Sequence, residues 1–288
     1  MKLYNAKQLC DKAMEQGFAI PALNNNGGSY DIGRAIVEAC EELQSPFIIQ
    51  CYEPNLAYRG FDYAGKLIRE LAADTTVPMA IALDHGSSPQ TVVRAVRAGF
   101  THVMIDYAYL PIEQNIAGSK SVLDLVRPLG ISVEAEIGHI IKSSDDSDKR
   151  APVTSVEEAK AFLNGIDIDM LAVAVGTTHG IFKEQNGIRF DLISKLKEIS
   201  GAPLVLHGTC GVSMSDITKA VKAGMTKINF GEGLRMNYIK YFNEMSLTLK
   251  HEGHAWRIER AAKDMLKEDI KTIIRAVGSE GRAANYKS

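Results

Sequence analysis

Short apolar runs alternate with longer amphipathic segments along most of the chain. We predict a β-strand at each apolar run, at residues 18–23, 47–51, 79–83, 102–105, 131–136, 170–174, 203–206 and 227–230. Most of these runs are continuously apolar, which is typical of parallel strands covered by helices. The pattern therefore indicates a series of strand–helix units.

The amphipathic segments between the runs carry helix signals. Residues 30–43 place their apolar side chains on one helical stripe. A second helix, at residues 88–98, starts with a serine cap at Ser88 and a proline at its first helical position, Pro89, and it ends at Gly99. These signals predict well-defined helices between the strands.

Eight strand–helix units in about 230 residues predict an α/β fold, a (β/α)8 TIM barrel with extra C-terminal helices. The length of 288 residues permits either two ordinary domains or one such barrel of ~250 residues. We predict a single domain over residues 1–288, with the barrel at about 1–233 and C-terminal helices at about 234–288. A doubly wound parallel sheet is the alternative.

The composition is close to that of an average soluble globular protein, with 45% hydrophobic and 24% charged residues. A net charge of -2 and the absence of a Lys/Arg-rich block argue against a nucleic-acid partner. No apolar run approaches the ~20 residues that span a bilayer, and the N-terminus lacks the apolar core of a secretory signal. Four widely spaced cysteines fit reduced thiols. We therefore expect a cytoplasmic protein with a small-molecule substrate and no membrane partner.

The carboxyl ends of the strands, where a TIM barrel carries its active site, are rich in polar residues. Three of the seven histidines stand there, each followed by a glycine: His85, His179 and His207. One histidine at such a position would most often be a structural residue. Three at the same rim favour a metal site, because neutral imidazole is a strong zinc ligand and three protein ligands leave one position open for substrate.

Three carboxylates accompany these histidines. Asp84 directly precedes His85, so the apolar strand at 79–83 is followed by an acid and an imidazole. Asp106 and Glu136 lie at the ends of two other predicted strands. Each of these two can bind a second cation, orient an imidazole, or serve as an ordinary structural acid.

Two glycine-rich turns follow the seventh and eighth predicted strands, "HGTCG" at residues 207–211 and "NFGEG" at residues 229–233. TIM barrels often bind phosphate here, because glycines let backbone N–H groups converge on an anion. Such turns also occur in barrels without a ligand. The long polar segment at residues 140–153 is either a lid over the active site or a solvated surface loop.

These segments together resemble the class II, metal-dependent ketose-bisphosphate aldolases, a family that includes fructose- and tagatose-bisphosphate aldolases. The resemblance covers nearly the whole chain and is specific, because several motifs occur in one order at strand ends. They are "GFAIPALN", "LDHGSS", "GFTHVMID", "ISVEAEIG", "IDMLAVAVGTTHG", "PLVLHGTCG", "KINFGEG" and the closing "GSEGRA".

The resemblance implies a role for each of the candidate residues. A catalytic zinc ion would be held by three imidazoles, those of His85, His179 and His207. Asp84 would protonate the aldehyde oxygen in the condensation direction. Asp106 and Glu136 match positions that hold a second divalent or a monovalent cation in some members.

The phosphorylated ketone half of the substrate, usually dihydroxyacetone phosphate, would bind at the turns after the last three strands. The matching residues are Gly180, Gly208, Thr209, Cys210, Asn229, Phe230, Gly231 and Glu232. In this chemistry zinc polarises the ketone carbonyl, so no lysine Schiff base is required.

The chain departs from the family pattern at three places. The glycine-rich acidic lid is replaced by "GHIIKSSDDSD", in which Asp145, Asp146 or Asp148 would have to act as the base. Cys210 and Glu232 stand where relatives usually carry hydroxyl residues. A carboxylate close to a phosphate costs several kcal/mol at an effective dielectric constant of ~20. We therefore expect a substrate choice that differs from that of fructose-bisphosphate aldolase.

The residues and the resemblance together predict a metal-dependent aldolase. It would form or cleave a ketose phosphate from dihydroxyacetone phosphate, or a related ketone, and an aldehyde. A metal-dependent hydrolase on a TIM barrel and a non-catalytic sugar-phosphate-binding barrel are the alternatives. The helices after residue 233 favour self-association into a homodimer or homotetramer.

Overall fold

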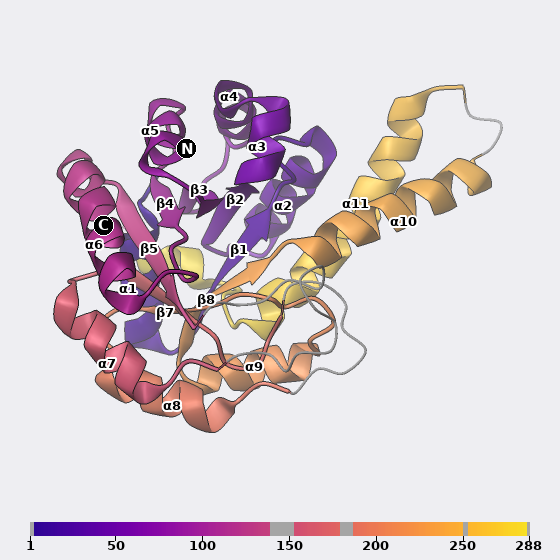
Figure 1. The fold of residues 1–288 in the computed structure, drawn as a ribbon. Helices are drawn as coiled ribbons and strands as arrows, with labels where there is room; N and C mark the ends of the chain where they lie inside the picture. Colours follow the sequence, from indigo (N-terminus) through magenta and orange to yellow (C-terminus); the bar gives the residue numbers. More distant parts are fainter. Residues whose placement is uncertain (1–2, 139–152, 179–186, 250–252, 287–288) are drawn as a thin grey trace.

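Eight parallel strands close into a barrel in chain order, with β8 paired to β1 (Figure 1). The computed structural model describes residues 3–138, 153–178, 187–249 and 253–286. The strands are β1 (Ile20–Asn24), β2 (Phe47–Tyr52), β3 (Met79–Gly86), β4 (His102–Ile105), β5 (Ser132–Ile137), β6 (Met170–Val173), β7 (Leu204–Leu206) and β8 (Met225–Phe230). The predicted TIM barrel is confirmed, and a doubly wound sheet, which would be open, is excluded.

Helices surround the barrel in the described part of the chain. They are α1 (Ala6–Gln16), α2 (Tyr30–Glu42), α3 (Glu53–Arg59), α4 (Phe61–Leu71), α5 (Pro89–Arg97), α6 (Ile112–Val126), α7 (Val156–Gly165), α8 (Phe190–Ile199), α9 (Met214–Ala223), α10 (Glu232–Thr248) and α11 (Ala255–Ala276), with short 3-10 helices η1 (Arg127–Leu129) and η2 (Arg282–Tyr286). None of these described helices combines the length and the hydropathy of a membrane span.

The local signals act where the sequence predicted them. The Ser88 side chain accepts a hydrogen bond from the backbone N–H of Thr91 at 3.2 Å, and Pro89 begins α5. Strand β3 extends beyond the predicted end at residue 83, so that Asp84 and His85 belong to the strand itself.

Alternate side chains of each strand point to opposite faces, and the parallel register keeps equivalent positions on the same face. Gln50 lies beside Ala82, and Met104 lies beside Glu134, so these positions point into the barrel together. Their neighbours along the strands, such as Ile49, point outward and form the main apolar core with the surrounding helices.

The inward positions differ along the barrel axis. Near the amino ends of the strands they are mostly apolar, and Leu9, Cys10 and Ala13 of α1 pack against them. These apolar positions are Ile20, Ala22, Ile48, Ala80, Ala82, Met170, Ala172 and Val205. Toward the carboxyl ends the inward positions are polar, and they are Asn24, Gln50, Asp84, Glu136, His207 and Asn229. Two further polar residues, Glu134 and Lys227, lie between the two ends, because Glu134 pairs with Met170 and Lys227 pairs with Ile20.

The last two long helices lie side by side and extend away from the barrel, while the lower part of α11 packs against α2 (Figure 1). Helix α10 begins at Glu232, two residues after β8 ends at Phe230. The first turn of α10 therefore lies at the carboxyl end of the barrel, where the candidate site is found.

Candidate active site

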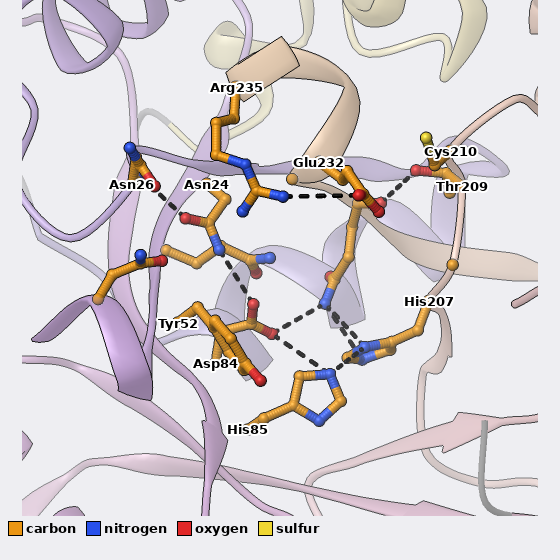
Figure 2. Close-up of a pocket in the computed structure, with 15 residues that line it drawn as sticks. Asn24, Asn26, Tyr52, Asp84, His85, His207, Thr209, Cys210, Glu232 and Arg235 are labelled. Atoms are coloured by element: carbon orange, nitrogen blue, oxygen red, sulfur yellow. Dashed lines mark hydrogen bonds and ion pairs between the residues drawn. The ribbon is translucent and has the colours of Figure 1, made fainter. Parts of the chain in front are cut away.

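A cavity of about 260 Å³ opens at the carboxyl ends of the strands (Figure 2). Its lining comes from the ends of β1, β2, β3, β7 and β8 and from the first turns that follow them. The lining residues are Asn24, Asn26, Gln50, Tyr52, Asn55, Asp84, His85, His207, Gly208, Thr209, Cys210, Asn229, Gly231, Glu232 and Arg235. The cavity therefore lies where barrels of this kind bind their substrates.

The end of β3 is bent so that His85 turns into the cavity. The φ angle of His85 is 51°, in the left-handed region that most residues avoid, and the β3–β4 register shifts between Leu83 and Gly86. A Cβ atom on Gly86 would lie 2.6 Å from the carbonyl oxygen of Met104. This close approach explains why a glycine follows the histidine.

The second histidine is placed by an equally tight turn. Gly208 has a φ angle of 69°, and a Cβ atom there would lie 2.7 Å from the carbonyl oxygen of Thr178. The hydroxyl of Thr177 donates a hydrogen bond to the backbone carbonyl of His207 at 2.7 Å. These contacts hold the end of β7 against the turn after β6.

The rings of His85 and His207 meet edge to face across the cavity, with Nε2 of His85 and Nδ1 of His207 3.2 Å apart (Figure 2). A tetrahedral zinc ion with Zn–N distances of ~2.0–2.1 Å would separate two nitrogen ligands by ~3.3 Å. A ligand atom of Asp84 lies within 4.8 Å of both rings. The donor types and their spacing thus fit a divalent transition-metal ion.

The other nitrogen of the His85 ring is oriented by a carboxylate, since Nδ1 lies 2.8 Å from Oδ2 of Asp106. Burial works against the charged imidazole, but the hydrogen bond to Asp106 and the charge of Asp84 outweigh it and raise the pKa of His85 to about 9. Burial works against the charged carboxylate as well, but the hydrogen bond from His85 lowers the pKa of Asp106 to about 2. A cation at Nε2 would compete with the proton there.

Asp84 is held from two sides by carboxamides. Nδ2 of Asn24 donates to Oδ2 of Asp84 at 3.0 Å, and Nδ2 of Asn229 lies 3.5 Å from Oδ1. Oδ1 is also 4.0 Å from Nε2 of His85. The carboxylate therefore faces the same space as the two imidazoles.

The remaining metal-site candidates are placed as follows. His85, Asp106 and Glu136 offer ligand atoms that lie within 4.8 Å of one another, beside the first group. His179, the third imidazole expected from the sequence, lies outside the described residues. Gly180 and the three lid acids Asp145, Asp146 and Asp148 lie outside them too.

The candidates for substrate binding meet at the other side of the cavity. Gly208, Thr209, Cys210, Asn229, Gly231 and Glu232 line it. Phe230 does not line this cavity, because it points outward into the core between barrel and helices. The cavity therefore brings together six of the eight substrate-binding residues expected from the sequence.

Glu232 lies in the first turn of α10, where one carboxylate oxygen is 3.6 Å from the guanidinium of Arg235 (Figure 2). Burial and the charge of Glu232 raise the pKa of the Cys210 thiol. Sequence reasoning missed Arg235, although its helical spacing of three residues from Glu232 predicts that the two share one face.

The sequence analysis assigned no functional role to Lys227 or to Glu134. Both lie inside the barrel, two positions before Asn229 and Glu136 on the same strands. The two-residue period of a strand, counted backward from those candidates, is the signal that would have found them.

The chain is similar to known proteins over nearly its whole length. Residues 4–282 match the family model described as fructose-bisphosphate aldolase class-II. A sulfofructosephosphate aldolase of Alkalicoccus urumqiensis is 33% identical over 99% of this chain and 100% of its own length. A fructose-bisphosphate aldolase of Thermus caldophilus is 32% identical over 98% of this chain and 100% of its own length.

Among solved structures, the YdjI aldolase of Escherichia coli K12 superposes with a TM-score of 0.86 at 28% identity, covering 98% of this chain and 99% of its own. The family match, the two relatives and the superposed structure all point to an aldolase, and the cavity at the carboxyl ends of the strands agrees with this assignment. The chain therefore belongs to the class II fructose-bisphosphate aldolase family and is an aldolase.

Proposed function

We propose that this aldolase is zinc-dependent and forms or cleaves a ketose phosphate from dihydroxyacetone phosphate, or a related ketone, and an aldehyde. His85, His207 and His179 are the proposed zinc ligands, and Asp106 and Glu136 are proposed to serve a second divalent or a monovalent cation. The observation that carries the proposal is the separation of 3.2 Å between Nε2 of His85 and Nδ1 of His207, beside the carboxylate of Asp84.

Zinc, when bound, would supply the positive charge that polarises the ketone carbonyl. Asp84 is proposed to give a proton to the aldehyde oxygen during condensation and to take it back during cleavage. The hydrogen bonds from Asn24 and Asn229 support this role, because they hold the carboxylate within reach of the same centre. The proton at the ketone carbon would be exchanged by an acid of the segment that contains Asp145, Asp146 and Asp148.

The phosphate of the ketone half is proposed to bind between the turn after β7 and the start of α10, where Gly208, Thr209, Cys210, Asn229, Gly231 and Glu232 lie. The carboxylate of Glu232 would repel a phosphate there, and the guanidinium of Arg235, 3.6 Å from it, offsets that charge. A pair of opposite charges thus replaces the hydroxyl residue that is usual at this position. We propose that substrate choice differs accordingly from that of fructose-bisphosphate aldolase.

The two relatives support a divergence of substrates within the family at this level of similarity. One is named for sulfofructosephosphate and the other for fructose bisphosphate, yet their identities to this chain are 33% and 32%. Identity therefore does not choose between the two substrates, and the pair Glu232–Arg235 is the feature of this cavity that bears on the choice.

The metal requirement is tested by assaying the purified protein before and after chelation and after addition of zinc. Cleavage of fructose 1,6-bisphosphate, tagatose 1,6-bisphosphate and a sulfofructose phosphate should be compared by kcat/KM. We expect activity to disappear on chelation, to return with zinc, and to be at least ~100-fold weaker with fructose 1,6-bisphosphate than with the best substrate. Efficient turnover of fructose 1,6-bisphosphate would contradict the divergence.

Exchange of tritium from labelled dihydroxyacetone phosphate separates the aldolase from the alternatives. An aldolase removes the proton next to the ketone and releases the label into water without any aldehyde. A metal-dependent hydrolase, or a barrel that only binds sugar phosphates, would release none.

The role of the charge pair is tested by the substitution Glu232→Thr, which removes the carboxylate. We expect KM for the phosphorylated ketone to fall by ~5- to 30-fold, since a repulsion of order 1–2 kcal/mol at a partly exposed site is removed. Arg235→Gln should raise the same KM. An unchanged KM in both variants would show that the phosphate binds elsewhere.

We also propose that the protein is a cytoplasmic homodimer or homotetramer. Several large apolar side chains are exposed on the two extended C-terminal helices or just beyond their ends, and they are Met236, Ile239, Leu247, Leu249 and Trp256. Their burial in a subunit interface would support self-association. Light scattering at micromolar concentration measures the mass directly, and a mass equal to one chain would contradict this part of the proposal. No disulfide links the four cysteines, all of which lie in the described part of the chain, and this agrees with a reducing compartment.

A further inference from the structure

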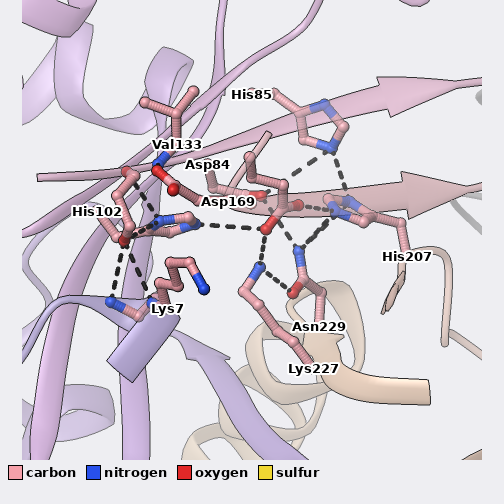
Figure 3. A network of polar contacts seen from close by, with 12 residues as sticks. Lys7, Asp84, His85, His102, Val133, Asp169, His207, Lys227 and Asn229 are labelled. Carbon is pink, nitrogen blue, oxygen red and sulfur yellow. Dashed lines mark hydrogen bonds and ion pairs between the residues drawn. The ribbon is translucent and has the colours of Figure 1, made fainter. Parts of the chain in front are cut away.

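Lys227 is a buried lysine inside the barrel with no role in the chemistry proposed above. Its side chain is 2% exposed, and it does not line the active-site cavity. The ammonium group lies 2.8 Å from Oε2 of Glu134 and donates to Oδ1 of Asn229 at 2.7 Å (Figure 3). A buried ammonium group is costly unless it is paired, so these two contacts need an explanation.

The first contact leads to the metal-site histidine. Glu134 is completely buried, and its second oxygen, Oε1, lies 2.7 Å from Nε2 of His207. The ammonium group of Lys227, 2.8 Å from Oε2, pairs with Glu134 as a carboxylate. A carboxylate can only accept, so Nε2 of His207 carries the hydrogen. Its Nδ1 then offers a lone pair on the side that faces His85.

The second contact leads to the proposed proton donor. A lysine can only donate, so the atom of Asn229 that faces Lys227 must be its oxygen. The amide nitrogen of Asn229 is thereby turned toward Oδ1 of Asp84, at 3.5 Å, and toward Nδ1 of His207, at 3.3 Å, which can accept its hydrogen (Figure 3). With the amide reversed, an oxygen would face the carboxylate and repel it.

We propose that Lys227 is a positioning residue that sets both halves of the active centre at once. Through Glu134 it fixes the tautomer of His207, and through Asn229 it fixes the position of Asp84. Lys227 acts only through these neighbours and does not touch the substrate. The inference rests on the proposed function, because it gives His207 and Asp84 the roles of metal ligand and proton donor.

The competing explanation is that Lys227 merely neutralises a buried carboxylate. Two variants separate the explanations. Lys227→Met keeps the volume but leaves Glu134 without its counter-charge, while Lys227→Met combined with Glu134→Gln removes both charges together. If neutralisation is all that matters, the double variant should recover both the thermal stability and the activity of the original protein.

We expect Lys227→Met to lower kcat by ~100-fold with KM changed less than ~3-fold, because the defect lies in the reacting geometry and not in substrate binding. We expect its affinity for zinc or cobalt to fall by ~10- to 100-fold, as for other partners that orient metal ligands. The double variant should melt closer to the original protein but keep the low kcat, since Asn229 is still not oriented.

A matched control is available in Lys263 on α11. This lysine is 8% exposed and is paired with Glu38 and Asp264, far along the chain from the cavity. Lys263→Met should lower stability without changing kcat or metal affinity. It therefore measures what the loss of a buried, paired lysine does by itself.

The tautomer of His207 can be measured independently of enzyme activity, from ¹⁵N–¹H spectra of the imidazole rings in the metal-free protein. We expect a single tautomer of His207 with the hydrogen on Nε2 in the original protein and in Lys263→Met, and a loss of that preference in both Lys227 variants. Recovery of kcat in the double variant, or an unchanged His207 tautomer there, would overturn the proposal. If the protein bound no metal, the proposed function would fail while this spectrum still tested the role of Lys227.

Discussion

The inside of the barrel has an apolar end and a polar end, and both are built from the same kind of strand position. Near the amino ends of the strands, Ile48, Ala80 and Met170 pack against one another and against α1. Near the carboxyl ends, the equivalent inward positions carry charges and imidazoles, such as Asp84 and His207. Along β2, for example, the inward side chains change from apolar to polar within two residues.

This difference shows what each end contributes. The apolar end is held by side-chain packing, which tolerates modest changes of shape at a cost in stability. The polar end is held by hydrogen bonds with defined donors and acceptors, so an exchange of one group changes the orientation of the next. Substitutions at the two ends should therefore fail in different ways, as stability at one end and as function at the other.

The largest effect is expected from removal of an imidazole at the polar end. His85→Ala or His207→Ala should lower the zinc content of the purified protein to near zero and reduce activity to background, because the two nitrogens are 3.2 Å apart and face one centre. Zinc is measured by atomic emission after dialysis. His254→Ala, at the exposed cap of α11, is the control and should keep its zinc.

The next largest effect separates proton transfer from metal binding. Asp84→Ala should reduce kcat for condensation by ~10²- to 10⁴-fold, as is usual for loss of a general acid, while the zinc content stays the same. Asp74→Ala, on the exposed turn before β3, should have neither effect. Loss of zinc from Asp84→Ala would mean that this carboxylate is a metal ligand and not the proton donor.

At the apolar end the expected effect is on stability alone. Met170→Ala should lower the free energy of unfolding by ~2–5 kcal/mol, because a fully buried side chain leaves a cavity. Chemical denaturation measures this loss, and kcat per folded molecule should stay within ~2-fold of its original value. Met14→Ala, at a Met that is 36% exposed, is the matched control. A large loss of kcat in Met170→Ala would show that the two ends are coupled.

The smallest effect is expected outside the barrel, at a carboxylate of the helical shell. Glu41 accepts hydrogen bonds from Thr75 and Thr76 near the start of β3. Burial works against the charged carboxyl, but these hydrogen bonds outweigh it and lower the pKa of Glu41. A lowered pKa stabilises the fold above the ordinary value of ~4.3, and this stability is lost as the pH falls through the folded-state pKa.

Glu41→Gln should therefore lower the melting temperature slightly at neutral pH and flatten its decrease in acid. Melting curves between pH ~6 and ~3 test this, with Glu70→Gln on an exposed face as the control. Equal slopes for Glu41→Gln and the original protein would rule out this contribution.

The strands and helices could be predicted closely because their signals are local. The apolar run at 79–83 and the cap at Ser88 act through neighbouring residues, and the structure places β3 and α5 there. The position of Asp84 at a strand end was equally visible in the sequence. The continuous apolar character of the runs hid the alternation of side chains, however. Every second position of a strand faces the barrel interior, and the others face the surrounding helices.

The network below the cavity could not be predicted in the same way. Glu134 and Lys227 are 93 residues apart, and they meet only because β5 and β8 face each other across the closed barrel. Arg235 is another such case, since its place at the cavity depends on α10 starting directly after β8.

The sequence by itself determined the alternation of strands and helices and the helix caps, because each depends on bonds and contacts within a few residues. The tertiary structure alone decided which carbonyl oxygens lie against Gly86 and Gly208, which ring nitrogens face each other, which atom of the Asn229 amide meets Lys227, and which charge Glu232 meets. Closure of the barrel brings strand ends together from distant parts of the chain, and the direction of each hydrogen bond is then set by partners that no local pattern contains.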